Sequence, residues 1–331
     1  MNLLNHINTY QSEADYKNDK SKNFPNVSYI VENDNVLFKV IRYEQQYFAI
    51  ESLEDDNAIM FKISSDIGAP SASSAKTISI STDDGDTWTD YTSTVDGTTI
   101  ATLNIGQKVL IRGNNDTYFH SDSFSCFTAS KQIDVNGNIM SLIYGDNFKE
   151  QYSFPSGTNY NFSNIFNSAP IVSAKNLILP ATTLAEGCYQ YMFKGCTSLV
   201  KAPTLPATTL ATNCYRSMFR DCTGLTRAPE LPATTLARQC YSYMFKGCKS
   251  LTTAPELPAT TLTSWCYTGM FNGCTSLNYI KCLATNISAS NCTLIWVSNV
   301  ASTGRFVKAA SMTSWTTGDD GIPTGWTVVT E

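Results

Sequence analysis

The sequence predicts an α+β chain of several domains, in which a small antiparallel β-sandwich precedes a short α/β solenoid of 26-residue repeats. The first observation is a phrase close to LPATTLA··CY··MF·GC·SL··AP that recurs with a constant step. It begins at Pro180, Pro206, Pro232 and Pro258. The second is that cysteine and leucine positions keep this step, which is typical of stacked repeats. The third is that the preceding segment alternates β-type runs with turn signals.

Length and composition exclude several classes of function. A chain of 331 residues has room for two or three domains. The net charge is −5 and the cations are thinly spread, which argues against a nucleic-acid partner or an anionic membrane surface. No run of 18 apolar residues occurs, so we expect no membrane insertion. Residues 1–24 lack the apolar centre of a secretory signal, which predicts either assembly in the cytoplasm or a chain from which a signal has been removed.

We divide the chain into five segments: a flexible attachment arm at 1–26, a β-hairpin plus β-sandwich at 27–130, a solenoid N-terminal cap with a degenerate repeat at 131–178, the repeats at 179–296 and a C-terminal cap at 297–331. Expected strands of the second segment are 27–31, 36–40, 47–50, 58–63, 77–81, 88–91, 98–103 and 108–112. The Asn136-Gly137 pair predicts a hairpin joining 133–135 to 139–144.

Each repeat is expected to contain one helix and one very short strand. Leu184, Cys188 and Met192 are spaced by four, which predicts an apolar stripe on a helix of about three turns. Gly195 would end that helix, and Pro203 would end the strand that follows. The predicted repeat core comprises Leu184, Cys188, Phe193, Cys196, Leu199, Cys214, Cys222, Cys240, Cys248, Cys266 and Cys274.

The repeats at the two ends depart from the pattern. Counting back 26 residues from Cys188 and Met192 gives Phe162 and Phe166, so we expect large aromatics at those core positions. At the other end Trp296 and Val297 replace the Met-Phe pair. Such departures are expected where a repeat must close an open core.

The cysteines are expected to be buried free thiols that act as small hydrophobic side chains. Cys188 and Cys196 would lie about 12 Å apart on a helix, too far for one disulfide or one metal ion. Cross-repeat disulfides and a metal site remain alternatives. Cys282 and Cys292 break the pattern and are the expected exception.

One segment resembles the Asp-box hairpin of sialidases, through Ser81, Asp83, Gly85 and Trp88 in S-x-D-x-G-x-T-W. We expect Asp83 to accept hydrogen bonds from the turn, Gly85 to adopt a positive φ, and Trp88 to pack inward. The expected role is structural, with calcium or glycan contact as the alternative.

No catalytic constellation can be identified, and we expect no catalytic residue, no metal and no cofactor. The chain has two histidines, neither in a nucleophile pattern. Nucleotide, zinc and hydrolase motifs do not occur. A carbohydrate-binding or carbohydrate-hydrolysing module, indicated only by the single Asp box, is the alternative to a non-enzymatic protein.

Positions that vary between repeats are the candidate ligand contacts. Lys201, Arg227 and Tyr279 flank the predicted strand, and Tyr191, Tyr243 and Trp265 lie on the predicted helix. Exposed aromatic side chains there would form a platform for sugar or protein. The alternative is unconstrained variation of a surface.

Three copies, MFKGCTSLVKAP, MFRDCTGLTRAP and MFKGCKSLTTAP, resemble the F-x-x-C-x-x-L core of BspA-like leucine-rich repeats, found in surface proteins of gut Bacteroidales. The resemblance covers about residues 131–331. It implies a leucine-rich-repeat solenoid used for adhesion or ligand capture, without catalytic residues.

The opening FPNVSYIVENDNVLF resembles virion proteins of phages that infect those bacteria, including crAss-like phages. This implies a virion fibre or decoration protein assembled in the host cytoplasm, whose arm contacts other virion proteins. Its ligand would be a protein or glycan on a host cell or mucosal surface. A BspA-like adhesin at the bacterial cell surface is the alternative, and a purely structural spacer is a third.

Overall fold

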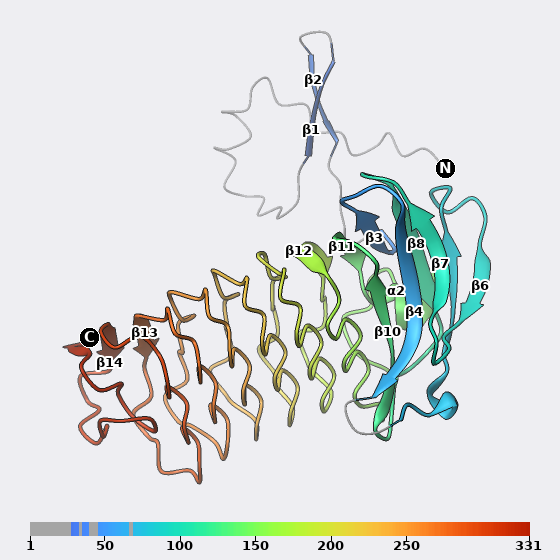
Figure 1. Ribbon diagram of the computed structural model, residues 1–331. Helices are drawn as coiled ribbons and strands as arrows, with labels where there is room; N and C mark the ends of the chain where they lie inside the picture. Colours follow the sequence, from blue (N-terminus) through green and yellow to red (C-terminus); the bar gives the residue numbers. More distant parts are fainter. Residues whose placement is uncertain (1–27, 33–34, 40–45, 66–68) are drawn as a thin grey trace.

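The computed structural model describes residues 28–32, 35–39, 46–65 and 69–331. The predicted arm at 1–26 lies outside the described residues. The predicted first hairpin is confirmed as a pair of antiparallel strands, β1 (Ser28–Glu32) and β2 (Asn35–Lys39). In Figure 1 a stack of coils extends from a two-sheet region to the C-terminus.

The two-sheet region is the predicted β-sandwich. One sheet has the strand order β7-β4-β10-β9 and the other β12-β11-β3-β8-β5-β6. The strands are β3 (Phe48–Ser52), β4 (Asn57–Ser65), β5 (Thr77–Ser81), β6 (Thr89–Thr92), β7 (Thr98–Leu103), β8 (Lys108–Gly113), β9 (Phe119–His120), β10 (Ser123–Ala129), β11 (Ile133–Asn138) and β12 (Ile171–Ile178). A short 3-10 helix, η3 (Ala72–Ser74), precedes β5. The sequence therefore predicted β3 to β8, with β5 and β7 placed residue for residue, but it did not predict β9, β10 or β12.

The predicted hairpin at 133–144 is wrong. β11 pairs antiparallel with β3 and parallel with β12, and the chain then forms α2 (Ser141–Tyr144) and η4 (Gly145–Asn147). Gly137 has a φ of 76°, but it serves a close approach and not a hairpin turn. A Cβ on Gly137 would lie 2.0 Å from the Tyr47 carbonyl oxygen.

The predicted helices of the repeats are also wrong, because each repeat is a coil of successive four-residue turns. Left-handed residues recur every fourth position, as at Gly187, Tyr191 and Gly195. Such residues interrupt an α-helix. The same triplets occur in six coils, over 160–168, 187–195, 213–221, 239–247, 265–273 and 291–299, and we call these segments the turn ladder.

Alternate backbone N–H groups hold the turn ladder together. Tyr189, Tyr191 and Phe193 donate to carbonyls of the following coil at 2.9–3.0 Å. The amides between them donate within the coil, to the residue three positions back, as Met192 does to Tyr189. Because both sets recur in the first five coils, each of these coils satisfies its backbone polar groups only when the next coil is present, and the last coil donates to Asp319 and Asp320 instead.

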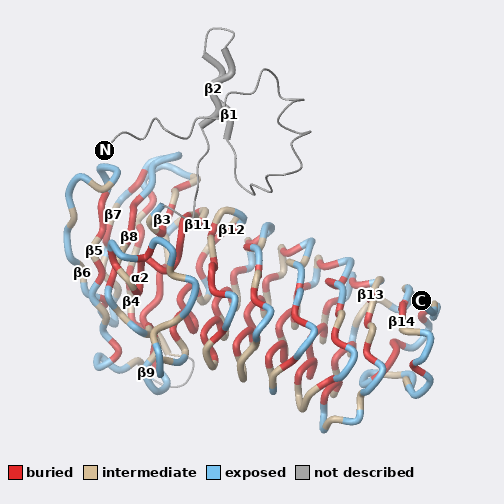
Figure 2. Tube along the Cα trace, turned by 180° about the vertical axis from the view of Figure 1, so that it is seen from behind, coloured by how far each residue is buried: buried red, intermediate tan, exposed pale blue. Residues whose placement is uncertain are grey.

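Two columns of stacked aromatic rings fill the core of the coils. Phe193, Phe219, Phe245 and Phe271 form one, with ring centroids 5.5, 5.7 and 5.8 Å apart. Tyr189, Tyr215, Tyr241 and Tyr267 form the other, at 5.7, 5.9 and 6.2 Å. Leu184, Leu199 and the repeat cysteines are buried beside them. Figure 2 shows buried positions recurring coil by coil along the stack.

The first coil is offset from the others by 27 residues and not by the predicted 26. Phe162 stacks on Tyr189 and Phe166 on Phe193, so they extend the two aromatic columns and do not occupy the Cys188 and Met192 positions. Phe48 and Phe127 of the sandwich contact Phe166, with ring centroids 5.6 and 6.4 Å apart. The sandwich therefore covers this end of the stack, and the two parts share one hydrophobic core.

The other end closes with three parallel strands, β13 (Tyr279–Cys282), β14 (Arg305–Lys308) and β15 (Thr327–Thr330). Trp296 ends both aromatic columns. Its ring stacks on Tyr267 and Trp315, and its indole N–H donates to the Gly321 carbonyl at 2.8 Å. The substitution of Trp for Met thus supplies a side chain wide enough to cover the last coil.

Candidate ligand-binding surface

The outward side chains of the turn ladder form the first candidate surface. In each turn two side chains enter the core, as Cys188 and Tyr189 do. The next two, Gln190 and Tyr191, are partly exposed. Along the stack these two positions are partly exposed in some coils and buried in others, as at Ser217, Ser242 and Thr268.

Three predicted ligand contacts are left-handed residues of the turn ladder. Tyr191, Tyr243 and Trp265 have φ values of 57°, 55° and 64° and are half-buried. Such a conformation is uncommon for a bulky side chain. The Tyr243 ring lies over Gly269 of the next coil, where a Cβ would come within 2.2 Å of its Cε1 atom. The Tyr243 ring therefore lies along the surface of the stack, next to a residue small enough to admit it.

Cations lie beside the Tyr191 and Tyr243 rings, and the sequence did not indicate these contacts. The Lys194 ammonium lies 5.2 Å from the Tyr191 ring centroid, and the Arg216 guanidinium of the next coil lies 6.0 Å from it. Lys246 lies 5.5 Å from the Tyr243 centroid. Only the four-residue turn places Lys194 and Lys246 beside a ring.

The same region holds polar groups that the protein does not fully pair. Arg216 Nε and the Gln190 side-chain oxygen are buried and carry no hydrogen bond within the part of the chain that the structure describes. Arg220 is ion-paired with Asp221 at 3.3 Å. Burial, and then the nearby Glu186, raises the pKa of Tyr160, while Arg216 opposes the shift. Arg216 thus lies between two tyrosines and one carboxylate.

The other predicted contacts, Lys201, Arg227 and Tyr279, belong to a second surface, which we call the strand row. Asp134 is paired with Ser173, and Ser173 is bridged to Lys201. Farther along, Thr253 is bridged to Tyr279, and Tyr279 is paired with Arg305. Arg227 occupies the same repeat position between them. In most coils the predicted strand is only such a bridge. The six predicted contacts are therefore divided between the turn ladder and the strand row.

Two carboxylates face each other where the strand row enters the sandwich. Glu51 of β3 is directly opposite Asp134 of β11. Burial raises the pKa of both carboxyl groups, and the charge of Asp134 adds to the shift of Glu51. Lys108 is the register partner of Glu51 on its far side, and Lys201 lies beyond Asp134. The pair is therefore enclosed by two cations, an arrangement that offsets the like-charge repulsion across the strands.

The Asp-box hairpin forms as expected around Asp83. Ser81 Oγ donates to Asp83 Oδ1 at 2.6 Å, and the Thr87 backbone N–H donates to the same oxygen at 3.0 Å. These hydrogen bonds, Ser81 first, lower the pKa of Asp83 to about 2. Gly85 has a φ of 100°, as predicted. Within the described residues the hairpin thus uses its carboxylate for its own turn.

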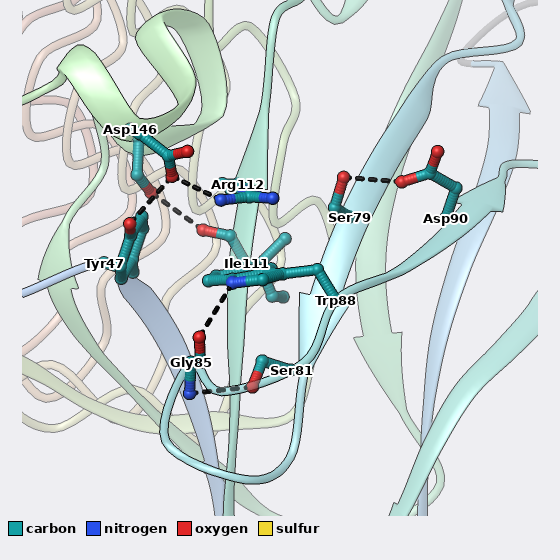
Figure 3. A network of polar contacts seen from close by, with 10 residues as sticks. Tyr47, Ser79, Ser81, Gly85, Trp88, Asp90, Ile111, Arg112 and Asp146 are labelled. Atoms are coloured by element: carbon teal, nitrogen blue, oxygen red, sulfur yellow. Dashed lines mark hydrogen bonds and ion pairs between the residues drawn. The ribbon is translucent and has the colours of Figure 1, made fainter.

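Trp88 does not pack inward as predicted. It is half-buried on the outer surface of the six-stranded sheet, where the Arg112 guanidinium lies 4.0 Å from its ring centroid (Figure 3). Tyr47 contacts the Trp88 ring edge to face at 4.9 Å and donates its hydroxyl to Asp146 at 2.7 Å. Asp146 also pairs with Arg112. Residues from three separate segments thus hold the indole in place.

All eleven cysteines are buried and free, including Cys282 and Cys292. Cys222 donates its thiol to the Phe193 carbonyl at 3.0 Å, and Cys248 and Cys274 make the equivalent bond in their coils. Burial raises the pKa of the Cys214 thiol to about 12. The thiols therefore act as small apolar side chains with one weak donor each.

Within the described residues, no three His, Cys, Asp or Glu side chains gather in a way that could hold a metal ion. In the same residues no helix has the length and apolar character needed to cross a membrane. Comparisons with models of known protein families, with curated proteins and with solved structures give no match to this chain.

Proposed function

We propose that this chain is a non-enzymatic recognition protein, in which a capped stack of coils presents its outward side chains to a ligand on a host-cell or mucosal surface. The observation that carries the proposal is the contrast between inward and outward positions of the same turns. Inward, Cys188, Tyr189 and Met192 recur unchanged in the next three coils. Outward, the Gly187 position becomes Asn213, Gln239 and Trp265, all partly exposed, and the Tyr191 position becomes Ser217, Tyr243 and Gly269, of which only Tyr243 is partly exposed.

This contrast supports recognition over a spacer role. The ladder and the aromatic columns fix the backbone of every coil, so outward side chains can differ without loss of packing. A rigid scaffold that positions variable side chains is the usual arrangement of a binding surface. The half-buried rings of Tyr191, Tyr243 and Trp265 add apolar area to it.

The proposal extends to the carrier of the protein. The repeat motif resembles BspA-like leucine-rich repeats, and the segment that opens with FPNVSYIVENDNVLF resembles phage virion proteins. We therefore place the chain on a virion, as a fibre or decoration protein. A search for its peptides in purified phage particles from a Bacteroidales host, against washed host membranes, tests this choice. Enrichment in the membranes would favour a bacterial adhesin.

Binding of the labelled protein to Bacteroidales cells and to mucus glycans tests the recognition role. We expect saturable binding that weakens in a variant carrying Tyr243→Ala and Trp265→Ala. Thr208→Ala and Thr260→Ala, at exposed threonines elsewhere in the coils, form the control pair. Wild-type binding by the aromatic variant would remove this surface from the proposal. Release of sugar from the glycans would contradict the non-enzymatic role.

A further inference from the structure

The outward cations of the turn ladder define a candidate site that the sequence did not indicate. We call it the turn face, and it consists of Tyr191, Lys194, Arg216, Arg220, Tyr243 and Lys246. All six side chains are partly exposed. We propose that the turn face binds an acidic glycan, whose sulfate or carboxylate groups pair with the cations while its sugar rings pack on the tyrosines. This inference rests on the proposed recognition function and names its ligand.

The first step is the spacing of the cations. Lys194, Arg220 and Lys246 occupy the same position in three consecutive coils. Phe193 and Phe219, each one residue before a cation, have ring centroids 5.5 Å apart, which gives the step between coils. The next coils have Asn272 and Ser298 at this position, so the run of cations ends there. A ligand with repeated negative groups can therefore contact several cations by lying along the stack.

The second step is the local charge. The chain has a net charge of −5, so a cluster of cations is not a general property of its surface. Four cations of the turn face are accompanied by Glu186 and Asp221, and Asp221 is already paired with Arg220. Arg216 adds a buried Nε without a hydrogen bond within the described residues. Guanidinium groups bind sulfate and carboxylate oxygens with two parallel hydrogen bonds.

The third step is the position of the aromatic rings, which supply apolar surface beside the cations. The net charge of −5 argues against a nucleic-acid partner. The Tyr243 ring lies against the coil surface over Gly269, and the ring of Tyr160 lies over Gly187 in the same way. Such rings form slightly raised apolar patches on the surface of the stack. The apolar faces of sugar rings can pack on these patches while the neighbouring lysines reach the acidic substituents.

The experiment measures binding of the full chain to dextran sulfate and to hyaluronan, with uncharged dextran and polyuridylate as comparison ligands. Dextran sulfate and dextran share a backbone and differ in charge. We expect one or both acidic glycans to bind, dextran not to bind, and binding to weaken as salt rises. The test variant carries Lys194→Gln and Lys246→Gln. The matched control carries Lys149→Gln and Lys175→Gln, which removes the same charge from two exposed lysines outside the turn face and the strand row.

We expect the test variant to bind about tenfold more weakly, since it loses two charged contacts, and the control to bind as the wild type does. Equal losses in both variants would overturn the assignment to the turn face. Equal or tighter binding of polyuridylate would overturn the glycan class. If no acidic glycan binds while host cells still do, the inference fails and the recognition function stands. If neither binds, both fail. Thermal unfolding of each variant confirms that its fold is retained.

Discussion

Tyr243 lies with its ring directly over Gly269, the residue at its own repeat position in the next coil. In this column a large left-handed residue in one coil is thus matched by a small one in the coil that follows. Tyr191 is followed by Ser217 at the same position, and in the neighbouring column the Tyr160 ring lies over Gly187. The column of Tyr191 and Tyr243 therefore follows a packing rule of its own, which limits where aromatic side chains can occur in it.

The first prediction tests that rule. Gly269→Ala should lower the free energy of unfolding by about 2–4 kcal/mol, because it adds a Cβ at a φ of 58° and forces the Tyr243 ring away. Urea unfolding followed by fluorescence measures the change. In the double variant with Tyr243→Ser the steric part should disappear, which leaves only about 1–2 kcal/mol of backbone strain. Equal losses in both variants would contradict the packing rule.

The second prediction concerns hydroxyl groups in the core. The Tyr189, Tyr215 and Tyr241 hydroxyl oxygens are buried and have no hydrogen-bond partner within the described residues. Tyr215→Phe should therefore leave stability unchanged or raise it by up to about 1 kcal/mol, because it removes an unpaired polar group without changing the stacked ring. Tyr215→Leu, which loses the stacking on Tyr189 and Tyr241, should cost about 2–4 kcal/mol. A clear loss in the Phe variant would show that the hydroxyl has a partner.

The third prediction concerns the thiols. Burial raises the pKa of the Cys282 thiol to about 12, and the pKa of Cys292 is raised as well. Alkylation of the native protein by iodoacetamide at pH 8 should therefore be slow at all eleven cysteines, since the thiolate is the reacting species. Mass spectrometry should find complete labelling only after unfolding. Cys292, which is 3 % exposed, should be the first native site to react. Rapid labelling of the repeat cysteines beside the aromatic columns would contradict the stacked core.

The fourth prediction is a pH dependence at the Asp-box hairpin. The pKa of Asp83 is lowered to about 2 by hydrogen bonds that its carboxylate accepts. A carboxyl group with a depressed pKa in the folded state stabilises the fold above its unfolded pKa of about 4, and this contribution is lost as the pH falls toward 2. Asp83→Asn should therefore be less stable than the wild type at pH 7, with the difference shrinking below pH 4.

Carboxyl NMR titration measures the Asp83 pKa directly, and denaturant unfolding at several pH values measures the stability difference. Asp86→Asn, at an exposed residue of the same turn, is the control and should not alter the pH profile of unfolding. A midpoint near 4 for Asp83 would show that the hydrogen bonds of the hairpin do not persist in solution.

The sequence predicted six of the sandwich strands, β3 to β8, and the buried repeat positions because both depend on local patterns. In Thr77–Ser81 the buried Ile78 and Ile80 are separated by a more exposed residue, and turn residues mark the ends of the strand. Leu184, Cys188 and Leu199 are buried as predicted. In these cases the spacing of the hydrophobic residues and the positions of the turn residues indicate the same structure.

The helix prediction failed because a spacing of four satisfies two structures. Leu184, Cys188 and Met192 align on an α-helix, and they also align when every turn has four residues. The signal that distinguishes the two structures was a separate set of positions, those that adopt a positive φ. Gly187, Gly195 and their equivalents Asn213 and Asp221 are residue types that tolerate a positive φ. Tyr191 carries no such signal, so its cations Lys194 and Arg216 could not be placed beside it.

The repeat positions already separated the candidate contacts into a group beside the strand and a group on the predicted helix. They did not indicate that Lys201 is bridged to Ser173 of the sandwich or that Tyr279 is paired with Arg305 of the C-terminal strands. Local patterns carry no information on such pairing. The 27-residue offset of the first coil was hidden for a related reason, since only the stacking of Phe162 on Tyr189 reveals the register.

The one-way donation of amides from each coil to the next has a consequence for how such a chain can change its length. Every internal coil offers the same carbonyl acceptors to the preceding coil and the same amide donors to the following coil. A tandem duplication of 26 residues would therefore add one complete coil without altering either end of the stack. Each duplication would move the closing Trp296 about one ring spacing, 5.5–5.8 Å, farther from the sandwich. The length of the stack can therefore change in steps of one coil by recombination between near-identical gene segments. The contact with the sandwich at one end and the C-terminal cap at the other would stay the same.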